Sequence, residues 1–504
     1  MKILHTSDWH LDAKLEQIPR ADEHARFLQW LRQTLIDEQI DALIVAGDVF
    51  DSGTPGNAAY LRYTQFLRDL WLDASAGKSH CRNVIVVAGN HDSPSFLGTS
   101  GPLLELLGMH VVTQPTGNLR EMLFPLRDSS GKTRCLVAAV PFLRERDLGP
   151  FMERNDELDL VSRFLQAFRG FYRQITKEAL ALREELLLNE FPNWETPNRT
   201  SEERLREAAL RIPILATGHL FTAHGQTLEG DGVRPIHVGT LDQFPACDFP
   251  QELDYVALGH LHVPQIVDGQ ARICYSGSPI PMGFSEIASP KRVILLETSA
   301  EEKTISEIPA ASDAPAAPKS SEGEETPFRS AVLEPSRLKV RERPVPCFQP
   351  MKVLRGDFEE IRQAAQALPV SSLPIWVKVE FTGETFELTI QDQIEELFQT
   401  LPHLLLVHFE NRTAQKRRRP EEISPHENLK QMNENDVFAR FLMTVHPNLD
   451  PSEKSELMET FQDLANRFHE KQAMGTEEPA NAVSDAMPDS NRAGKNQGTI
   501  FWEE

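Results

Sequence analysis

Seven residues near the ends of apolar segments carry side chains that could bind metal ions. They are Asp8, His10, Asp48, Asn90, His219, His260 and His262. Carboxylate, amide oxygen and imidazole donors without a thiolate suit Mn, Fe or Zn. Seven donors are too many for one ion, so the set predicts two divalent ions about 3.5–4 Å apart that share a bridging carboxylate. Such a pair hydrolyses phosphate esters, because it generates hydroxide from water and screens charge on the phosphoryl oxygens.

The elements that must position these donors are buried strands. Four donors directly follow a glycine at the end of an apolar run, in the pairs Gly47-Asp48, Gly89-Asn90, Gly218-His219 and Gly259-His260. Strand side chains alternate, so Asp8 and His10 face the same way, as do His260 and His262. Sites in α/β folds lie at the carboxyl ends of strands. Five strand ends therefore predict one convergent metal centre.

The first 309 residues form the large predicted domain. β-branched apolar runs such as "DALIVAGD" and "NVIVVAGN" alternate there with helix-period segments, which is typical of an α/β domain. An apolar stripe over residues 158–182 predicts one long helix that packs through this face. The following "EFPNWETPNRTSEER" predicts a surface loop that ends in a Ser or Thr helix cap.

The rest of the chain divides into segments of different composition. Residues 310–345 begin with a run rich in Pro, Ala, Ser and Glu and predict a disordered linker. Residues 346–412 show a β-α-β-α-β pattern, enough for a small α/β domain. Residues 433–472 predict an amphipathic helical hairpin, which either folds back or docks into the groove of a partner. Residues 473–504 predict a disordered tail.

Composition restricts the class of protein. A chain of 504 residues should hold about two or three domains. Its net charge of −23 argues against a generally cationic coat for nucleic acid, so DNA binding would need local basic patches, metal or a basic partner. The five cysteines are scattered, as expected in a reducing compartment. Without a membrane-spanning run or signal peptide, we expect a cytoplasmic protein with no membrane partner.

Taken together, the motifs resemble a known family. "DWH" at 8–10, "GDVFD" at 47–51, "GNHD" at 89–92, "GH" at 218–219 and "GHLH" at 259–262 are similar to the calcineurin-like metallophosphoesterases. "TSDWHLD", "HVGTLDQFP" and "YSGSPIPMGF" further resemble the bacterial SbcD nuclease subunits. The resemblance implies a four-layer αββα sandwich with a small α/β capping domain and a C-terminal helical hairpin.

The resemblance also implies roles for single residues. One ion would lie among Asp8, His10, Asp48 and His262, and the second among Asp48, Asn90, His219 and His260. Asp48 would bridge the two ions. His91 would contact the scissile phosphate and protonate or stabilise the departing oxygen. Asp92 would orient His91, and Asp51 stands where archaeal relatives carry a second histidine.

The implied activity is that of a Mn-dependent DNA nuclease. It would act as a 3′–5′ exonuclease on double-stranded ends and as an endonuclease on single strands and hairpins, in DNA repair, recombination and replication. Its partner would be an SbcC-type coiled-coil ATPase, gripped by the hairpin of 433–472. Relatives also form a homodimer within a heterotetramer, through helices that correspond to "NAAYLRYTQFLRDLW" and "GPLLELLG".

Two other functions are compatible with the same motifs. The scaffold could carry a phosphoesterase for cyclic nucleotides or phosphoproteins, since function depends on the site rather than on the fold. It could also be a non-catalytic scaffold for DNA ends or for the ATPase. The remaining histidines, including His5, His24, His80, His224 and His237, are interpreted as packing or surface residues, and the basic run at 416–419 as a solvated loop.

Overall fold

The computed structural model describes residues 1–152, 159–191, 194, 200–222, 244–267, 269, 271–298, 330–383, 389–412, 458 and 461. The chain divides into two compact units, Met1–Arg417 and Arg418–Glu504. The predicted hairpin of 433–472 lies outside the described residues except for Met458 and Phe461, which are helical. The predicted tail of 473–504 and the first part of the predicted linker also lie outside them.

The first unit contains a mixed seven-stranded sheet. Its strands are, in spatial order, β14 (Ser330–Leu333), β15 (Leu338–Pro344), β13 (Arg292–Glu297), β1 (Lys2–Thr6), β4 (Ala42–Ala46), β5 (Asn83–Val87) and β6 (Met109–Val112). The neighbours β1, β4, β5 and β6 run parallel, so their carboxyl ends share one edge of the sheet.

A six-stranded sheet packs against the first. Its strands are, in spatial order, β11 (Gln265–Ile266), β12 (Ile273–Tyr275), β10 (Tyr255–Gly259), β9 (Ile214–His219), β8 (Thr133–Ala138) and β7 (Leu123–Arg127). Strands β8, β9, β10 and β12 are parallel, and they bring a second set of carboxyl ends together.

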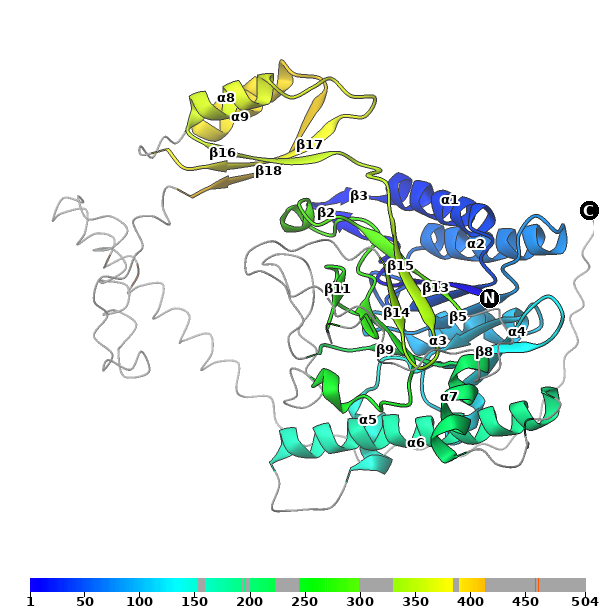
Figure 1. The fold of residues 1–504 in the computed structure, drawn as a ribbon. Coiled ribbons are helices and arrows are strands. Elements are labelled where there is room, and N and C mark those ends of the chain that lie inside the picture. Colours follow the sequence, from blue (N-terminus) through cyan, green and yellow to red (C-terminus); the bar gives the residue numbers. More distant parts are fainter. Residues whose placement is uncertain are drawn as a thin grey trace, which may run out of the picture. The chain divides into compact units, whose positions relative to one another are not determined.

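Helices cover the outer faces of both sheets (Figure 1). Helices α1 (Ala21–Asp37) and α2 (Asn57–Ser75) cover the first sheet, and α6 (Leu160–Glu190) and α7 (Ser201–Arg211) cover the second. Three short helices connect strands: α3 (Pro94–Leu97), α4 (Gly101–Glu105) and α5 (Glu145–Leu148). The four-layer αββα sandwich is therefore confirmed. No helix among the described residues is long and apolar enough to cross a membrane.

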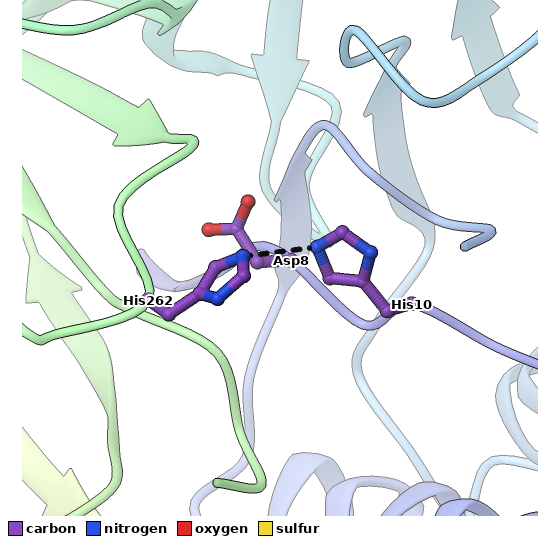
Figure 2. A group of neighbouring side chains, drawn as sticks. All are labelled: Asp8, His10 and His262. Carbon is purple, nitrogen blue, oxygen red and sulfur yellow. Dashed lines mark hydrogen bonds between the residues drawn. The ribbon is translucent and has the colours of Figure 1, made fainter. Parts of the chain in front are cut away.

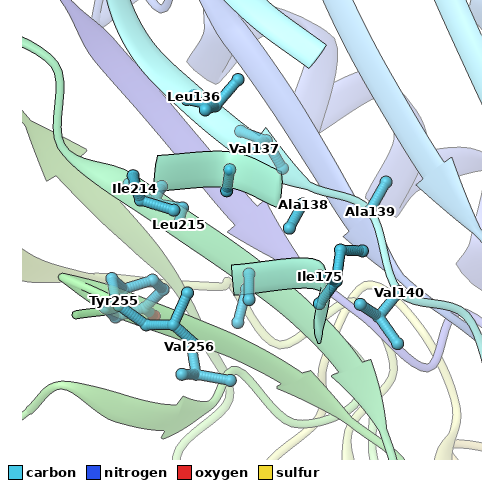
Figure 3. Close-up of a cluster of buried hydrophobic side chains, with 14 of the residues drawn as sticks. Leu136, Val137, Ala138, Ala139, Val140, Ile175, Ile214, Leu215, Tyr255 and Val256 are labelled. Atoms are coloured by element: carbon cyan, nitrogen blue, oxygen red, sulfur yellow. The ribbon is translucent and has the colours of Figure 1, made fainter. Parts of the chain in front are cut away.

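Alternation along the strands explains the layers. In β4, Ile44 packs between the two sheets, whereas Leu43 and Val45 pack under α1 and α2. Both faces of the strand are buried, and the sequence therefore shows a continuous apolar run rather than a polar alternation. Figure 3 shows part of the core between the second sheet and α6, where Ile175 meets the strands. Burial of each such aliphatic side chain stabilises the fold by about 1.5–3 kcal/mol.

Helix α6 confirms the predicted apolar stripe and extends beyond it. It begins at an Asp159 cap, whose side chain accepts from the N–H of Ser162, and continues to Glu190. The predicted Ser or Thr cap of the next helix is Thr200, which accepts from the N–H of Glu203 in a capping box.

The prediction that residues 310–345 form a disordered linker is wrong for residues 330–344. Residues 330–344 form β14 and β15, and β15 pairs antiparallel with β13 from Glu297↔Lys339 to Arg292↔Pro344. Leu338 and Val340 are buried, while the residues between and after them are charged. This alternation with period two marks a strand, and the polar composition of the segment hid it.

Beyond these strands lies a small α/β domain in the order β16 (Met351–Gly356), α8 (Phe358–Gln366), β17 (Ile375–Phe381), α9 (Ile390–Gln399) and β18 (Leu404–Asn411). Its three strands are parallel, and the helices pack on one face around Ile361, Val379 and Ile394. Met351 and Trp376 on this domain form an apolar cluster with Leu15 of the hairpin β2 (Lys14–Leu15) and β3 (Ile18–Pro19). The predicted small α/β domain is thus present.

Candidate metal centre

The seven predicted donors meet where the carboxyl ends of the two sheets face each other. Asp8, Asp48 and Asn90 follow the parallel neighbours β1, β4 and β5 of the first sheet. His219 ends β9 and His260 follows β10, which are parallel neighbours in the second sheet. The site is therefore assembled from both halves of the sandwich, as the spacing of the motifs predicts.

Asp8, His10 and His262 form the first donor group (Figure 2). One ligand atom from each lies within 4.8 Å of the others. The Nε2 atoms of His10 and His262 are 3.1 Å apart, and Nε2 of His10 is 3.6 Å from Oδ2 of Asp48. Two imidazole nitrogens at this distance either share one hydrogen or direct both lone pairs toward a cation, which the neighbouring carboxylates would also bind.

Asp48, Asn90, His219 and His260 form the second group. Nε2 of His219 lies 3.2 Å from Oδ2 of Asp48 and 2.9 Å from Oδ1 of Asn90. Nδ1 of His260 lies 3.3 Å from the same amide oxygen. The Asp48 carboxylate therefore stands between the two groups, with Oδ2 near a histidine of each.

Backbone contacts hold the two carboxylates in place. Oδ1 of Asp8 accepts from the N–H of His260 at 2.9 Å, across the two sheets. Oδ1 of Asp48 accepts from the N–H of His91 at 2.9 Å. Each aspartate thus uses one oxygen to fix a neighbouring motif. The second oxygen of Asp8 accepts from the Ser7 hydroxyl, and Oδ2 of Asp48 lies near His10 and His219.

Acceptor oxygens on the side away from the donor groups also orient the rings of His219 and His10. Nδ1 of His219 lies 3.0 Å from the carbonyl oxygen of Ala46. Because a carbonyl only accepts, Nδ1 carries a hydrogen, and Nε2 is the ring atom that faces Asp48 and Asn90. Nδ1 of His10 lies 3.3 Å from Oδ1 of Asp51, which gives Asp51 a structural role that sequence reasoning missed.

The electrostatics of the centre fit divalent cations. Burial is the main reason that the pKa of Asp8 is raised. Burial lowers the pKa of His219, but Asp48 outweighs it and the pKa rises to about 9. The raised pKa of His219 shows that the buried Asp48 carboxylate favours a positive charge beside it. The donor set, which contains oxygen and imidazole but no sulfur, can accept that charge from bound metal ions.

Glycines allow the strand ends to approach. A Cβ on Gly259 would lie 1.9 Å from the carbonyl oxygen of Ala46, and a Cβ on Gly89 would lie 2.1 Å from Oδ1 of Asp48. Neither position has room for any side chain. The glycines before the donors are therefore required by close packing at these two positions.

Four donors adopt backbone angles that L-residues rarely take. The φ angles are +52° at Asp8, +45° at His10, +50° at Asp48 and +103° at His260. Asp and His enter this region more readily than most residues, yet the conformation remains unfavourable. Such strain is concentrated at functional sites.

His91 lies at the edge of the centre. Its ring is perpendicular to that of His10, with centroids 4.8 Å apart, and its Nδ1 lies 2.7 Å from the carbonyl oxygen of Asp51. Nδ1 must donate to that carbonyl, so Nε2 is the atom that can exchange a proton with a substrate.

The role predicted for Asp92 needs correction. Its two oxygens accept from the backbone N–H groups of Val49, Phe50 and Gly89, at 3.1, 3.0 and 2.9 Å. Asp92 thus ties the second and third motifs together, whereas the Asp51 carbonyl orients the His91 ring. Burial raises the pKa of Asp92 to about 6, with a further contribution from Asp48.

The other described histidines lie apart from the donor groups. His5 is buried between the sheets, with Nδ1 3.0 Å from the Tyr255 hydroxyl and Nε2 3.2 Å from the Leu258 carbonyl. His24 is buried in α1, and His80 is exposed. His224, His237 and the basic run at 416–419 lie outside the described residues.

A double-sheet sandwich with this donor set defines the class of calcineurin-like phosphoesterases. The family model described as "Calcineurin-like phosphoesterase" matches residues 1–264, and the model described as "Type 5 capsule protein repressor C-terminal domain" matches residues 347–446. Proteins of this class use divalent metal ions.

Individual relatives narrow the assignment. The SbcD subunit of nuclease SbcCD from Escherichia coli K12 is 33% identical over 92% of this chain and 97% of that protein. The Bacillus subtilis protein of the same name is 32% identical over 61% of this chain and 69% of its own length. The chain belongs to the SbcD family of nuclease subunits, and it is a metal-dependent hydrolase. A solved structure, TT1561 of Thermus thermophilus, covers 55% of this chain and 89% of that chain at 16% identity, with a TM-score of 0.26.

Proposed function

We propose that this protein hydrolyses phosphodiester bonds of DNA with two divalent ions, which are Mn²⁺. It acts as a 3′–5′ exonuclease on double strands and as an endonuclease on single strands and hairpins. The observation that carries the proposal is the position of Asp48, whose Oδ2 lies 3.6 Å from Nε2 of His10 and 3.2 Å from Nε2 of His219. One carboxylate that serves two donor groups is what a two-metal centre requires.

Each ion has its own donor set in this proposal. Asp8, His10, Asp48 and His262 hold one ion, and Asp48, Asn90, His219 and His260 hold the other. When bound, the ions supply a hydroxide from water and screen negative charge on the phosphoryl oxygens. The chain itself fixes the donors through the Ala46 carbonyl and the Asp8 and Asp48 backbone contacts.

His91 supplies the proton chemistry. Its Nδ1 is held by the Asp51 carbonyl, so its Nε2 contacts the scissile phosphate and protonates or stabilises the departing oxygen. Asp92 supports this step indirectly, because it fixes the turn that carries His91.

The experiment compares His91→Asn with His80→Asn, an exposed histidine that serves as the control. With Mn²⁺ and linear duplex DNA, His91→Asn should lower the cleavage rate by about 10²–10⁴-fold. Mn²⁺ binding, measured by calorimetry, should stay unchanged in both variants. Normal cleavage by His91→Asn would refute the assigned role.

The same assay separates the alternative functions. A cyclic-nucleotide or phosphoprotein phosphoesterase would turn over those substrates rapidly and leave DNA intact. A non-catalytic scaffold would bind DNA ends or the ATPase without metal-dependent cleavage of any substrate. The complete donor set in one buried centre supports catalysis over the scaffold.

The proposed partner is an SbcC-type coiled-coil ATPase, in the cytoplasm, during DNA repair, recombination and replication. The name SbcCD of the relatives supports a two-component nuclease. The net charge of −23 supports it too, because an acidic nuclease needs basic surface from elsewhere to hold DNA. The segment proposed to grip the coiled coil is 433–472, and its deletion should abolish co-purification with the ATPase while DNA-independent Mn²⁺ binding persists.

We also propose that two copies associate through α2 and α4. Leu61 and Leu72 are exposed on one face of α2, since eleven residues complete about three turns. On and directly after α4, Leu103 and Leu106 are 65% and 82% exposed. Large exposed apolar side chains are a feature of interaction surfaces. Leu103→Asp with Leu106→Asp should give a monomer in analytical ultracentrifugation, whereas Leu205→Asp on α7, also exposed, should not.

A further inference from the structure

A buried glutamate lies behind one of the metal-binding histidines. Glu286, in the short 3₁₀ helix η5 (Phe284–Glu286), has no exposed surface. Its Oε1 lies 3.4 Å from Nδ1 of His262, the nitrogen on the far side of the ring from the donor group. Among the described residues, Oε1 accepts no well-aligned hydrogen bond, and the His262 ring is its ion-pair contact. A fully buried carboxylate does not contribute to solubility, and its Oε1 atom points toward the His262 ring.

A buried lysine completes the arrangement. Nζ of Lys291 contacts Oε2 of Glu286, and it also donates to the backbone carbonyl of His262 and to the hydroxyl of Ser278, both at 2.9 Å. The N–H of Ser278 donates to the same His262 carbonyl at 3.1 Å. Lys291 thus contacts the backbone of His262, and Glu286 contacts its ring.

The partner of His262 differs in charge from the partner of His219. Nδ1 of His219 faces a neutral carbonyl, that of Ala46. Nδ1 of His262 faces a carboxylate. Both acceptors keep the hydrogen on Nδ1, but an anionic acceptor also increases the electron density of the ring and makes Nε2 the stronger ligand.

We propose that Glu286 and Lys291 are positioning residues that fix the tautomer and the ring of His262 and so set the affinity of one of the two metal sites. The proposal deepens the two-metal function and rests on it. Glu286 holds Nδ1–H, so that Nε2 of His262 faces Asp8 and His10. Lys291 neutralises the carboxylate and anchors the turn that carries the histidine. The site built on His219 and Asn90 does not depend on this pair.

The decisive measurement is Mn²⁺ binding by the full chain, with calorimetry for affinity and electron paramagnetic resonance for occupancy. Glu286→Gln keeps the shape and removes the charge. It should weaken one Mn²⁺ site by about 10–100-fold and leave the other unchanged. Glu380→Gln is the matched control, because Glu380 is also a buried carboxylate in an ion pair, with Arg355 and Lys378, but lies in the small α/β domain. It should leave both sites intact.

A second variant guards against misfolding. Glu286→Gln alone leaves Lys291 as a buried cation without its carboxylate, so Glu286→Gln/Lys291→Met removes both charges together. This double variant should fold and show the same loss at one site. His262→Ala provides the reference for complete loss of that site.

The outcomes distinguish the two levels of the proposal. If the wild-type protein binds fewer than two divalent ions, the two-metal function itself fails. If the wild type binds two ions and both Glu286 variants bind them with wild-type affinity, only the positioning role is overturned. Equal weakening of both sites would also overturn it, because that result indicates a general structural effect.

Discussion

Replacement of Gly259 by alanine tests the central geometric feature of the site. Gly259 ends β10 in the second sheet, and a Cβ there would lie 1.9 Å from the carbonyl oxygen of Ala46 at the end of β4 in the first sheet. The same Cβ would lie 2.9 Å from Nδ1 of His219. The Ala46 carbonyl also accepts a hydrogen bond from Nδ1 of His219. One added methyl group must therefore push the two sheets apart and displace the His219 ring at the same time.

The size of the effect follows from these contacts. Overpacking of a close contact costs about 1–3 kcal/mol, and loss of the histidine–carbonyl hydrogen bond adds about 1 kcal/mol. We therefore expect Gly259→Ala to lower the free energy of unfolding by about 2–4 kcal/mol. For a domain of this size that corresponds to a fall in Tm of roughly 4–10 °C. Displacement of His219 should also weaken Mn²⁺ binding.

The assay is differential scanning calorimetry of the full chain, with Mn²⁺ titrated in parallel. Gly101→Ala is the matched control, because its Cβ would meet no atom within 4 Å and it starts helix α4. That variant should melt at or slightly above the wild-type temperature. If Gly259→Ala melts within 1 °C of wild type, as a rough margin, and binds Mn²⁺ normally, the backbone contact between the sheets is refuted.

Three further predictions address other features. Burial raises the pKa of Asp254 from its ordinary 3.8 to about 6, so the folded protein binds the proton more tightly and loses stability as pH rises between these values. Asp254→Asn should therefore raise the free energy of unfolding by about 3 kcal/mol at pH 7.5 and give no gain at pH 3.5, as chemical denaturation at both pH values will show. Removal of metal by a chelator should lower Tm, because a ligand at 100 times its Kd stabilises the folded state by about 2.7 kcal/mol; an unchanged Tm would contradict a buried metal centre. Of the five cysteines, Cys247 and Cys347 are exposed, so a thiol reagent should label two rapidly and the other three only after unfolding.

Four of the candidate donors were predictable because each has the same local signal. Asp48, Asn90, His219 and His260 each follow an apolar run and a glycine, and parallel strands bring such ends together. Convergence then needs no knowledge of distant contacts. The layered order of the two sheets came instead from the family resemblance, since a continuous apolar run such as that of β4 does not reveal what covers each face.

The missed features depend on contacts between distant residues. Strand β15 is largely polar, and it is stabilised by pairing with β13 on one side and β14 on the other. Asp92 stands next to His91 in sequence, but its oxygens turn to the backbone of another motif. Glu286 lies outside every motif, and with Ser285, Ser289, Lys291 and Arg292 nearby it carries no local signal of its role.

The left-handed backbone angles at Asp8, His10 and Asp48 create a conflict between stability and activity in protein engineering. Each such angle costs about 1 kcal/mol relative to glycine, so a library selected for heat resistance alone should enrich glycine at these positions. Those winners would be inactive, and a thermostable version of this nuclease therefore has to be selected with metal present and cleavage as the criterion.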